Sequence, residues 1–509
     1  MRSFTLILSL LFVTSAAADF PELFNSEPLS DETLMPAALA AASMQLPKGL
    51  IAKSFASEPD VQNPIAMSWD AKGRLWVAEN YTYAERQQRF QLDLRDRIVI
   101  FDNTHKDRFR TRTVFTDDVQ MLTGMEVGLD GVWLMCPPKL IFIPDRNQDD
   151  VPASAGEVVL DGFTVAQQNY HNFANGLQFG PDGWLYGRCG GSCPAKIGVP
   201  GTPDQNRLAL EGGMWRYHPK NKRVEVLTTG TTNPWGHDWN SLGEAFFVNT
   251  VNGHLWHLIP GAHFTRPFVL DPNRRTYELI DFHADHWHFD TGQSWTKSRD
   301  GTANSYGGGH AHSGTMVYQA DNWPENYRDR LFTLNFHGRR ANQEILIRNG
   351  SGYVASHGKD MLLAKDPWFR GMELGSGPDG AVFILDWSDA GECHEHTGVH
   401  RTSGRIFKIR NTKPSISSRP TNLTHWSLSE LVDAHTSRND WFIRQARLEL
   451  ARRRMTRDIT SSYPLLTKLL NSSESTPSIK VQALLTLHVL GGTHRSLLRE
   501  LSEAEHESL

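Results

Sequence analysis

Several side chains suited to proton transfer or ligand binding stand just before short apolar segments of the chain. In YHNFANGLQFGPDGWLYGRCGG, residues 170–191, His171 lies upstream of a Gly-Pro-Asp-Gly turn. Histidine can act as a general base near neutral pH, because an unperturbed imidazole has a pKa of about 6.5. A loop histidine that only binds a backbone carbonyl is the alternative at each position. The residues in comparable positions are His171, Asn175, Asn233, His237, Asp238, His310, His312, His337 and Arg339.

A second segment carries oxygen ligands at alternate positions. Residues 145–157 read DRNQDDVPASAGE. Calcium loops use this spacing, because alternate residues of a tight loop point their oxygens inward. Asp150 replaces the usual glycine, and Glu157 lies one residue beyond the expected bidentate position. The pattern predicts a calcium site, with a solvated acidic turn as the alternative. The predicted ligands are Asp145, Asn147 and Asp149.

Two further segments are rich in softer ligands. Residues 281–290, DFHADHWHFD, contain three histidines, and residues 391–400, GECHEHTGVH, contain Cys393. Imidazole-rich clusters suit zinc or copper. Because alternate residues of a strand point to opposite faces, an exposed histidine-rich loop is favoured for the first segment. The second segment matches no metal motif.

The elements that position these residues are repeated hairpins. Apolar runs joined by Asp/Gly/Asn turns recur along the chain, and a looser copy covers residues 315–336. Most of the turns lie roughly 50 to 60 residues apart, which is typical of propeller blades. We therefore predict a mainly β protein, a six-bladed β-propeller with four strands per blade. A β-sandwich would not explain six similar hairpins. The turn glycines are Gly73, Gly131, Gly183, Gly243 and Gly380.

Beyond the hairpins the pattern becomes helical. Apolar residues recur at helical spacing, and Gln445-Ala446 recurs 37 residues later as Gln482-Ala483, close to the period of HEAT-like helical pairs. We expect these helices to pack on the propeller. The predicted divisions are a signal peptide (1–18), a lead-in segment (19–46), the propeller (47–412), a linker (413–423) and HEAT-like repeats (424–509).

Composition and the N-terminus restrict where the protein works. The first 18 residues have a basic start, an apolar run and a small-residue cleavage site, which predicts export to the periplasm or beyond. No later segment is long and apolar enough to cross a bilayer. Charge is nearly balanced, with 52 basic and 57 acidic residues and no basic run, which argues against nucleic acid as a partner. Cys189 and Cys193 could form a disulfide or remain two thiols.

Four long motifs carry a family resemblance. They are HNFANGLQFGPDGWLYG, TTNPWGHDWNSLGEAFFVNTVNGHLWH, GGGHAHSGTMVYQADNWPENYRDRLFTLNFHGRRAN and GMELGSGPDGAVFILDWSDAGECHEHTG. Over residues 47–410 the chain resembles exported planctomycete and verrucomicrobial proteins labelled membrane-bound dehydrogenases. More distantly it is similar to the soluble quinoprotein glucose/sorbosone dehydrogenases. These are six-bladed propellers that bind pyrroloquinoline quinone and calcium.

This resemblance implies an oxidoreductase acting on a sugar or a sugar-derived alcohol or aldehyde. His171 would be the base that takes the hydroxyl proton. Arg339 and Arg340 would meet the carboxylates of the quinone, with surface ion pairs that brace blade five as the alternative. Thr232 stands where the quinoproteins have an arginine. Longer family members carry a c-type haem domain, so a c-type cytochrome is the expected electron acceptor. The implied catalytic residues are His171, His237 and Asp238, and the implied cofactor contacts are Asn233, His310, His312, Arg339 and Arg340.

Two other functions remain open. One is a calcium-dependent lactonase or esterase, in which an ion in the channel polarises a carbonyl. Its ligands would be Asn175, Asn233 and Asp238. The other is a non-catalytic propeller that binds glycans or a protein. Thr232 favours either alternative, and the family resemblance favours the dehydrogenase.

Overall fold

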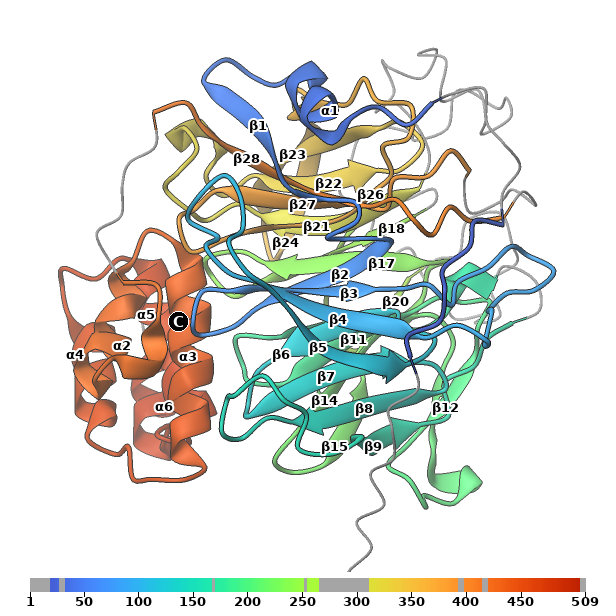
Figure 1. Ribbon diagram of the computed structural model, residues 1–509. Coiled ribbons are helices and arrows are strands. Elements are labelled where there is room, and N and C mark those ends of the chain that lie inside the picture. Colours follow the sequence, from blue (N-terminus) through green and yellow to red (C-terminus); the bar gives the residue numbers. More distant parts are fainter. Residues whose placement is uncertain are drawn as a thin grey trace, which may run out of the picture.

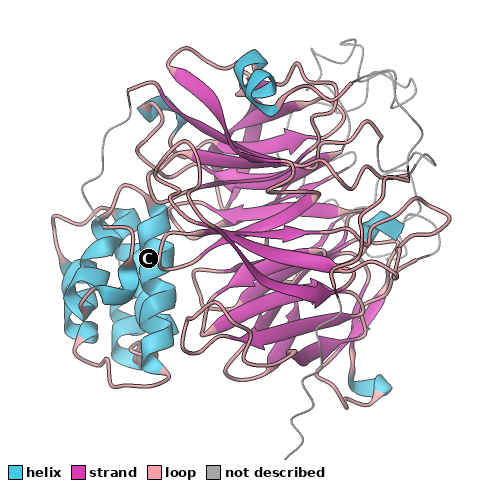
Figure 2. Ribbon diagram, in the orientation of Figure 1, coloured by secondary structure: helices cyan, strands magenta, loops and turns pink. Residues whose placement is uncertain are grey.

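The computed structural model describes residues 19–26, 33–166, 170–250, 254–264, 311–391, 398–413 and 420–503. Most of the described chain is β-structure, and a separate group of helices follows it (Figures 1 and 2). Within these residues, no helix is long and apolar enough to cross a membrane. The expected signal peptide lies outside the described residues.

Six antiparallel sheets form the blades, and the order of strands within each sheet follows the chain from the inner strand outwards. Blade one holds β2 (Pro64–Trp69), β3 (Leu75–Glu79), β4 (Asp96–Phe101) and β5 (Arg112–Val119). Blade two holds β6 (Gly124–Val127), β7 (Gly131–Cys136), β8 (Lys139–Pro144) and β9 (Glu157–Asp161). Blade three holds β10 (Asn175–Phe179), β11 (Leu185–Cys189), β14 (Gly213–His218) and β15 (Arg223–Val226).

The remaining blades complete the ring. Blade four holds β17 (Pro234–Trp239), β18 (Ala245–Asn249) and β19 (Leu255–His257). Blade five holds β21 (His312–Val317), β22 (Leu331–Asn335), β23 (Arg340–Asn349) and β24 (Gly352–His357), and β25 (Leu362–Leu363) also pairs with β23. Blade six holds β26 (Gly371–Ser376), β27 (Val382–Asp386), β28 (Arg405–Asn411) and β1 (Leu50–Ser57). Two small sheets join β12 (Ala195–Ile197) to β13 (Leu208–Leu210) and β16 (Thr229–Gly230) to β20 (His263–Phe264).

The N-terminal strand closes the ring. β1 pairs antiparallel with β28, so the last blade combines one strand from the beginning of the chain with three from its end. The inner strands β2, β6, β10, β17, β21 and β26 contact one another in this order, and β26 also contacts β2. The chain is therefore a six-bladed β-propeller, as the hairpin spacing predicts.

The hairpin turns show why glycine recurs. Gly73, Gly183 and Gly243 have φ of +80° and Gly380 has +73°, a conformation that residues with a Cβ rarely adopt. Gly131 differs, because the left-handed residues of its turn are Leu129 and Asp130, with φ of +54° and +63°. Gly131 itself begins β7, where a Cβ would collide with the carbonyl oxygen of Ile143.

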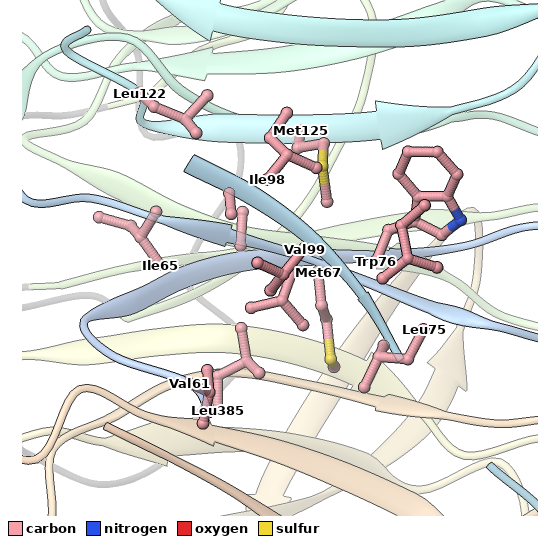
Figure 3. Packing of buried hydrophobic residues seen from close by; sticks show 14 of the residues in the cluster. Val61, Ile65, Met67, Leu75, Trp76, Ile98, Val99, Leu122, Met125 and Leu385 are labelled. Carbon is pink, nitrogen blue, oxygen red and sulfur yellow. The ribbon is translucent and has the colours of Figure 1, made fainter. Parts of the chain in front are cut away.

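The hydrophobic core lies between the blades. One cluster joins Ile65 and Met67 of β2, Trp76 of β3, Met125 of β6 and Leu385 of β27, so it spans blades six, one and two (Figure 3). Burying such side chains stabilises the fold by roughly 1.5–3 kcal/mol each. The core therefore holds neighbouring blades together as well as the strands within them.

Helices flank the propeller at two places. α1 (Ala37–Ser43) contacts β1, and its buried alanines join the core between blades five and six. The C-terminal helices α2 (Leu428–Asp433), α3 (Asp440–Arg454), α4 (Ser462–Asn471), α5 (Pro477–Val489) and α6 (Arg495–Leu501) share a core of their own. Figure 1 shows this orange and red group against one side of the propeller.

The repeated Gln-Ala pairs attach these helices to the blades. Gln445 Nε2 of α3 donates to the carbonyl of Trp69 at the end of β2, over 3.0 Å. Gln482 Nε2 of α5 donates to the carbonyl of Ser241 in the turn after β17, over 3.1 Å. The helices therefore cover the end of the propeller where the inner strands finish. The HEAT-like character of the helices and the exact domain limits stay predictions.

Candidate functional site

The two ends of the propeller channel differ in what surrounds them. We call the end where the inner strands begin the entrance face, and the end covered by α3 and α5 the helical face. At the entrance face, five of the six inner strands are irregular near their start, as at Asn175/Leu177 and Pro234/Gly236. β-bulges re-aim side chains and often lie beside active sites.

Aromatic side chains from several blades meet at the entrance face. Trp235, in the bulge of β17, and Phe336, just after β22, are half-buried and pack against the cluster that contains Trp387. The ring of Trp235 lies 5.7 Å from that of Phe173, and Tyr83 lies 5.9 Å from Trp387. We call these five residues the aromatic cap. It presents partly exposed ring surface, which suits the packing of a planar or ring-shaped ligand.

His171 lies at the edge of this face. It is half-buried in the 3₁₀ turn η1 (Tyr170–Asn172), immediately before the lead into β10. The neighbouring Asn172 fixes the loop, because its Nδ2 donates to Ser192 Oγ over 2.7 Å and its carbonyl accepts from Gly190 N. The role of His171 as a base stays a prediction.

Asn233 offers a second polar position. Its backbone N–H donates to Asn249 Oδ1 over 2.6 Å, which anchors the lead into β17. Its own Oδ1 is buried and accepts no hydrogen bond from any described residue. An orphaned buried oxygen is uncommon and marks a place where a ligand group can donate. Thr232, beside it, donates from its N–H to the same Asn249 oxygen.

The predicted cofactor contacts of blade five separate into two groups. His312 Nε2 lies 3.1 Å from Asn342 Oδ1, and the His312 ring stacks on His254 at 4.2 Å. Arg340 is buried and pairs with Asp360 at 2.8 Å. Both therefore belong to a polar network between blades four and five, and the ion pair of Arg340 is a bracing contact. Arg339 is half-buried with φ of +52° in the loop after β22.

His237 lies deeper, inside the channel. Arg188 of β11 crosses the inner strand at Gly176, where any Cβ would collide with the guanidinium. Arg188 Nε donates to Asn175 Oδ1 over 3.0 Å, and its Nη1 lies 3.2 Å from His237 Nδ1. Because a guanidinium only donates, Nδ1 must accept and the neutral ring carries its hydrogen on Nε2. Burial, and then the charges of Arg188 and Arg444, hold the pKa of His237 well below its usual value.

Two glutamates share this interior. Glu126 of β6 accepts from Phe179 N and Ser68 Oγ, and Glu373 of β26 accepts from Met67 N, so each joins its blade to the next. Burial is the main cause that raises the pKa of both carboxyls to about 7. Arg188 acts in the opposite direction on Glu373. Such carboxyls are half-protonated near neutral pH, the state that acid–base chemistry uses.

Asp238 has a different task. Its Oδ2 accepts from Val317 N over 2.8 Å, which links blade four to blade five. Its Oδ1 pairs with Arg444 of α3 at 2.8 Å, and Arg444 also pairs with Asp440 at 2.7 Å. Asp238 therefore fixes the helices to the end of the channel. His237 and Asp238 are adjacent in β17, and they therefore belong to the channel interior and to the helical face. His171, in contrast, lies at the entrance face.

A cavity of about 890 Å³ extends from this interior between the propeller and the helices. Its inner end, which we call the axial chamber, is lined by buried polar groups. Its outer end lies between blades two and three and the helices, at exposed residues such as Glu157 and Lys222. The chamber residues are Glu126, Arg188, His237, Thr315 and Glu373.

Sequence reasoning missed Arg188, Glu126 and Glu373. The two glutamates could have been recognised from the sequence, because the inner strands of blades two and six begin in nearly the same way. The sequences are Gly-Met-Glu-Val-Gly and Gly-Met-Glu-Leu-Gly. A lone carboxylate inside an apolar inner strand points to the channel. The sequence around Arg188 contains no comparable pattern, because the direction of this side chain depends on the bulge at Gly176.

The predicted calcium ligands lie at the helical face, in the loop between β8 and β9. Asn147 Nδ2 donates to Asp149 Oδ2 over 2.7 Å, and Asp149 Oδ1 accepts from Val151 N. Burial, then the charge of Asp150, raises the pKa of Asp145. Within the described ranges, no group of three or more His, Cys, Asp or Glu side chains is arranged to hold a metal ion.

Other sequence candidates have simple outcomes. Cys189 and Cys193 are buried free thiols and do not form a disulfide with each other. His310, the histidines of residues 281–290 and Cys393 lie outside the described residues.

Comparison with known proteins gives a family and a set of similar folds. No curated protein matches the chain. A glucose dehydrogenase-type oxidoreductase from Thermus thermophilus is 16% identical, with a TM-score of 0.46 over 71% of this chain and 100% of that one. A PQQ-bound aldose sugar dehydrogenase from Streptomyces coelicolor is 14% identical, with a TM-score of 0.41 over 72% of this chain and 100% of that one. A gluconolactonase from Xanthomonas campestris is 10% identical, with a TM-score of 0.39 over 77% of this chain and 99% of that one.

The family match covers the blades and their N-terminal approach. A family model described as a domain of unknown function, DUF7133, matches residues 36–413, which run from the residue before α1 to just beyond β28. Since these residues make up most of the chain, the protein belongs to the DUF7133 family.

Proposed function

We propose that this protein oxidises a sugar, or a sugar-derived alcohol or aldehyde, at the entrance face, with pyrroloquinoline quinone as its cofactor. The observation that carries this proposal is the aromatic cap, with His171 and the orphaned Asn233 Oδ1 on the same face. The four motifs that resemble the membrane-bound dehydrogenases and quinoproteins contribute residues to this face. Export to the periplasm and a c-type cytochrome as electron acceptor are part of the same proposal.

The entrance-face residues fit a planar, polyanionic group. Half-buried Trp235 and Phe336 present ring surface for a planar cofactor. The half-buried Arg339 brings positive charge to the loop after β22. Hydride acceptance is the chemistry that a bound quinone supplies. Because position 232 is a threonine and not an arginine, Arg339 and Trp235 would hold the quinone.

The chain's own residues then bind and deprotonate the substrate. The imidazole of His171 takes the proton of the substrate hydroxyl, which makes loss of hydride from the same carbon favourable. The aromatic cap excludes water on one side of the substrate. Asn233 Oδ1 accepts from a second hydroxyl and so orients the ring.

The calcium-dependent lactonase fits less well. Two of its three ligands already lie beside cations: Asn175 Oδ1 accepts from Arg188, and Asp238 Oδ1 pairs with Arg444. Positive charge next to these oxygens opposes binding of a divalent cation. The loop with Asp145, Asn147 and Asp149 stays a predicted calcium site at the helical face, where an ion would order the loop between β8 and β9.

The test is a cofactor titration. Mature protein with calcium is titrated with pyrroloquinoline quinone by calorimetry, and sugar-dependent dye reduction is then measured. We expect stoichiometric binding, and a loss of dye reduction of about 10²-fold or more in His171→Ala with binding retained. His105→Ala, an exposed histidine, is the matched control. Absence of quinone binding would refute the proposal and favour a non-catalytic glycan-binding propeller. Full turnover by His171→Ala would refute the role of His171 as the base.

A further inference from the structure

We propose that the axial chamber is a second ligand site, separate from the entrance face, for a small carboxylic acid that also carries hydroxyl groups. The proposal does not depend on the oxidation chemistry above. It rests on the charges, the free hydrogen-bonding atoms and the opening of the cavity between the propeller and the helices.

Two buried arginines at this cavity have only neutral hydrogen-bond partners. Arg188 binds Asn175 Oδ1 and His237 Nδ1. Arg447 of α3 donates to Thr486 Oγ1 over 3.0 Å and to Gln482 Oε1. Burial lowers the pKa of Arg188 to about 10, although the charge of Glu373 acts in the opposite direction. Burial, and then the charge of Arg444, lowers the pKa of Arg447 to about 9. A carboxylate from a ligand is the group that best offsets the cost of burying these charges.

Two further atoms of the chamber can bind hydroxyl groups. His237 is 4% exposed, and its Nε2 has no hydrogen-bond partner among the described residues. Thr315 Oγ1 is also without one, in a residue that is 8% exposed. The two residues lie on the neighbouring inner strands β17 and β21. Because Arg188 forces the ring hydrogen onto Nε2, His237 presents a donor, and the hydroxyl of Thr315 can donate or accept.

The shape of the cavity suits a small molecule. Its volume of about 890 Å³ lies within the usual range for ligand pockets. Trp239 at the end of β17 and Trp441 of α3 also line it. Entry from the outer end, between the helices and blades two and three, avoids the aromatic cap. Carboxylate at the arginines and hydroxyls at His237 and Thr315 therefore define the ligand class.

The site should depend on pH. Glu126 and Glu373 share the chamber, and both carboxyls have a pKa of about 7. The other charged groups that face them are Arg188 from β11, Asp238 from β17, and Asp440 and Arg444 from α3. Below pH 7 the glutamates lose their charge and the arginines attract the ligand. Above pH 7 they ionise and repel a carboxylate.

The test uses calorimetric titration of the full chain with gluconate, with gluconamide and acetate as the neutral and the unhydroxylated comparison. We expect gluconate alone to bind, about tenfold more weakly at pH 8.5 than at pH 6. Thr315→Val should weaken binding five- to tenfold, the effect of one lost hydrogen bond. The exposed Thr113→Val is the matched control, and His171→Ala should bind gluconate as the wild type does.

Arg188→Gln provides a second variant, and thermal unfolding shows whether it has kept its fold. A folded Arg188→Gln protein should lose gluconate binding. Equal binding by Thr315→Val and the wild type would overturn the proposal, as would equal binding of gluconamide or acetate. Loss of gluconate binding in His171→Ala would also overturn it, because the ligand would then lie at the entrance face.

Discussion

Arg188 shows how one side chain determines the chemistry of its neighbours. By donating to His237 Nδ1 it fixes the tautomer of the imidazole. Burial, together with the charge of Arg188, lowers the pKa of His237 and keeps the ring neutral. The sequence marked His237 as a candidate because it stands early in an inner strand. It could not assign the role, since the direction of a side chain beside a bulge depends on backbone irregularity that residue types do not reveal.

At the same scale, the carboxyl of Glu126 should make stability depend on pH. Burial raises its pKa from 4.5 to about 7, so the folded protein holds this proton more tightly than the unfolded chain does. The stabilisation that the protonated Glu126 adds to the free energy of unfolding is therefore complete below pH 4.5. It is lost as the pH rises towards 7. The wild type should lose about 3 kcal/mol of unfolding free energy in this way at alkaline pH, and Glu126→Gln should not show this loss.

Denaturant unfolding at pH 5 and pH 8 measures the effect. The variant should gain stability relative to the wild type at pH 8 but not at pH 5. Glu157→Gln, an exposed glutamate, should leave the difference between the two pH values unchanged. An identical pH dependence in Glu126→Gln and the wild type would show that the carboxyl titrates normally.

Among the elements, the hairpins were the most predictable. Alternating apolar residues and a turn glycine require little long-range information, so five turns could be located from sequence. One of these glycines has another function, since Gly131 begins a strand and Leu129 and Asp130 make the turn. The pairing of β1 with β28 was not foreseen, because the two strands are separated by nearly the whole propeller.

The repeated Gln-Ala pairs of α3 and α5 should each contribute to docking. Gln445→Ala removes one hydrogen bond to a propeller carbonyl and should cost about 1 kcal/mol. Gln482→Ala removes such a bond and also an acceptor of Arg447, so it should cost about 2 kcal/mol. The two sites are on different helices and blades, so the effects should add. Gln87→Ala, an exposed glutamine, is the control.

Thermal unfolding with a helical and a tryptophan signal tests this prediction. We expect the double variant to lose helix before the propeller unfolds. Coincident transitions at the wild-type temperature would contradict a docking role for these glutamines.

For the whole molecule, the spacing of hairpins predicted six blades, and composition predicted a helical addition. Which end of the channel the helices cover was not predictable, because it depends on contacts such as that of Arg444 with Asp238. The set of site residues predicted from the sequence was therefore incomplete. His171 and Asn233 are placed by their own strand leads, whereas the axial chamber combines residues from five strands of five different blades.

The closing strand should limit the stability of the ring. Phe55 of β1 is fully buried and its ring contacts Phe101, Phe109 and Phe383. Phe55→Ala should therefore cost about 3–5 kcal/mol, whereas the exposed Lys53→Ala on the same strand should cost little. Chemical denaturation of both variants measures this. A small effect of Phe55→Ala would mean that β1 is dispensable for closure.

The closure of the ring by β1 also sets an order of events during synthesis. β1 leaves the ribosome early, but its partner β28 follows only after about 350 further residues. Until then its backbone edge is uncovered, which invites association with other chains. Ring closure is therefore the last step of propeller assembly, and the six blades gain their full mutual support only when the chain is nearly complete.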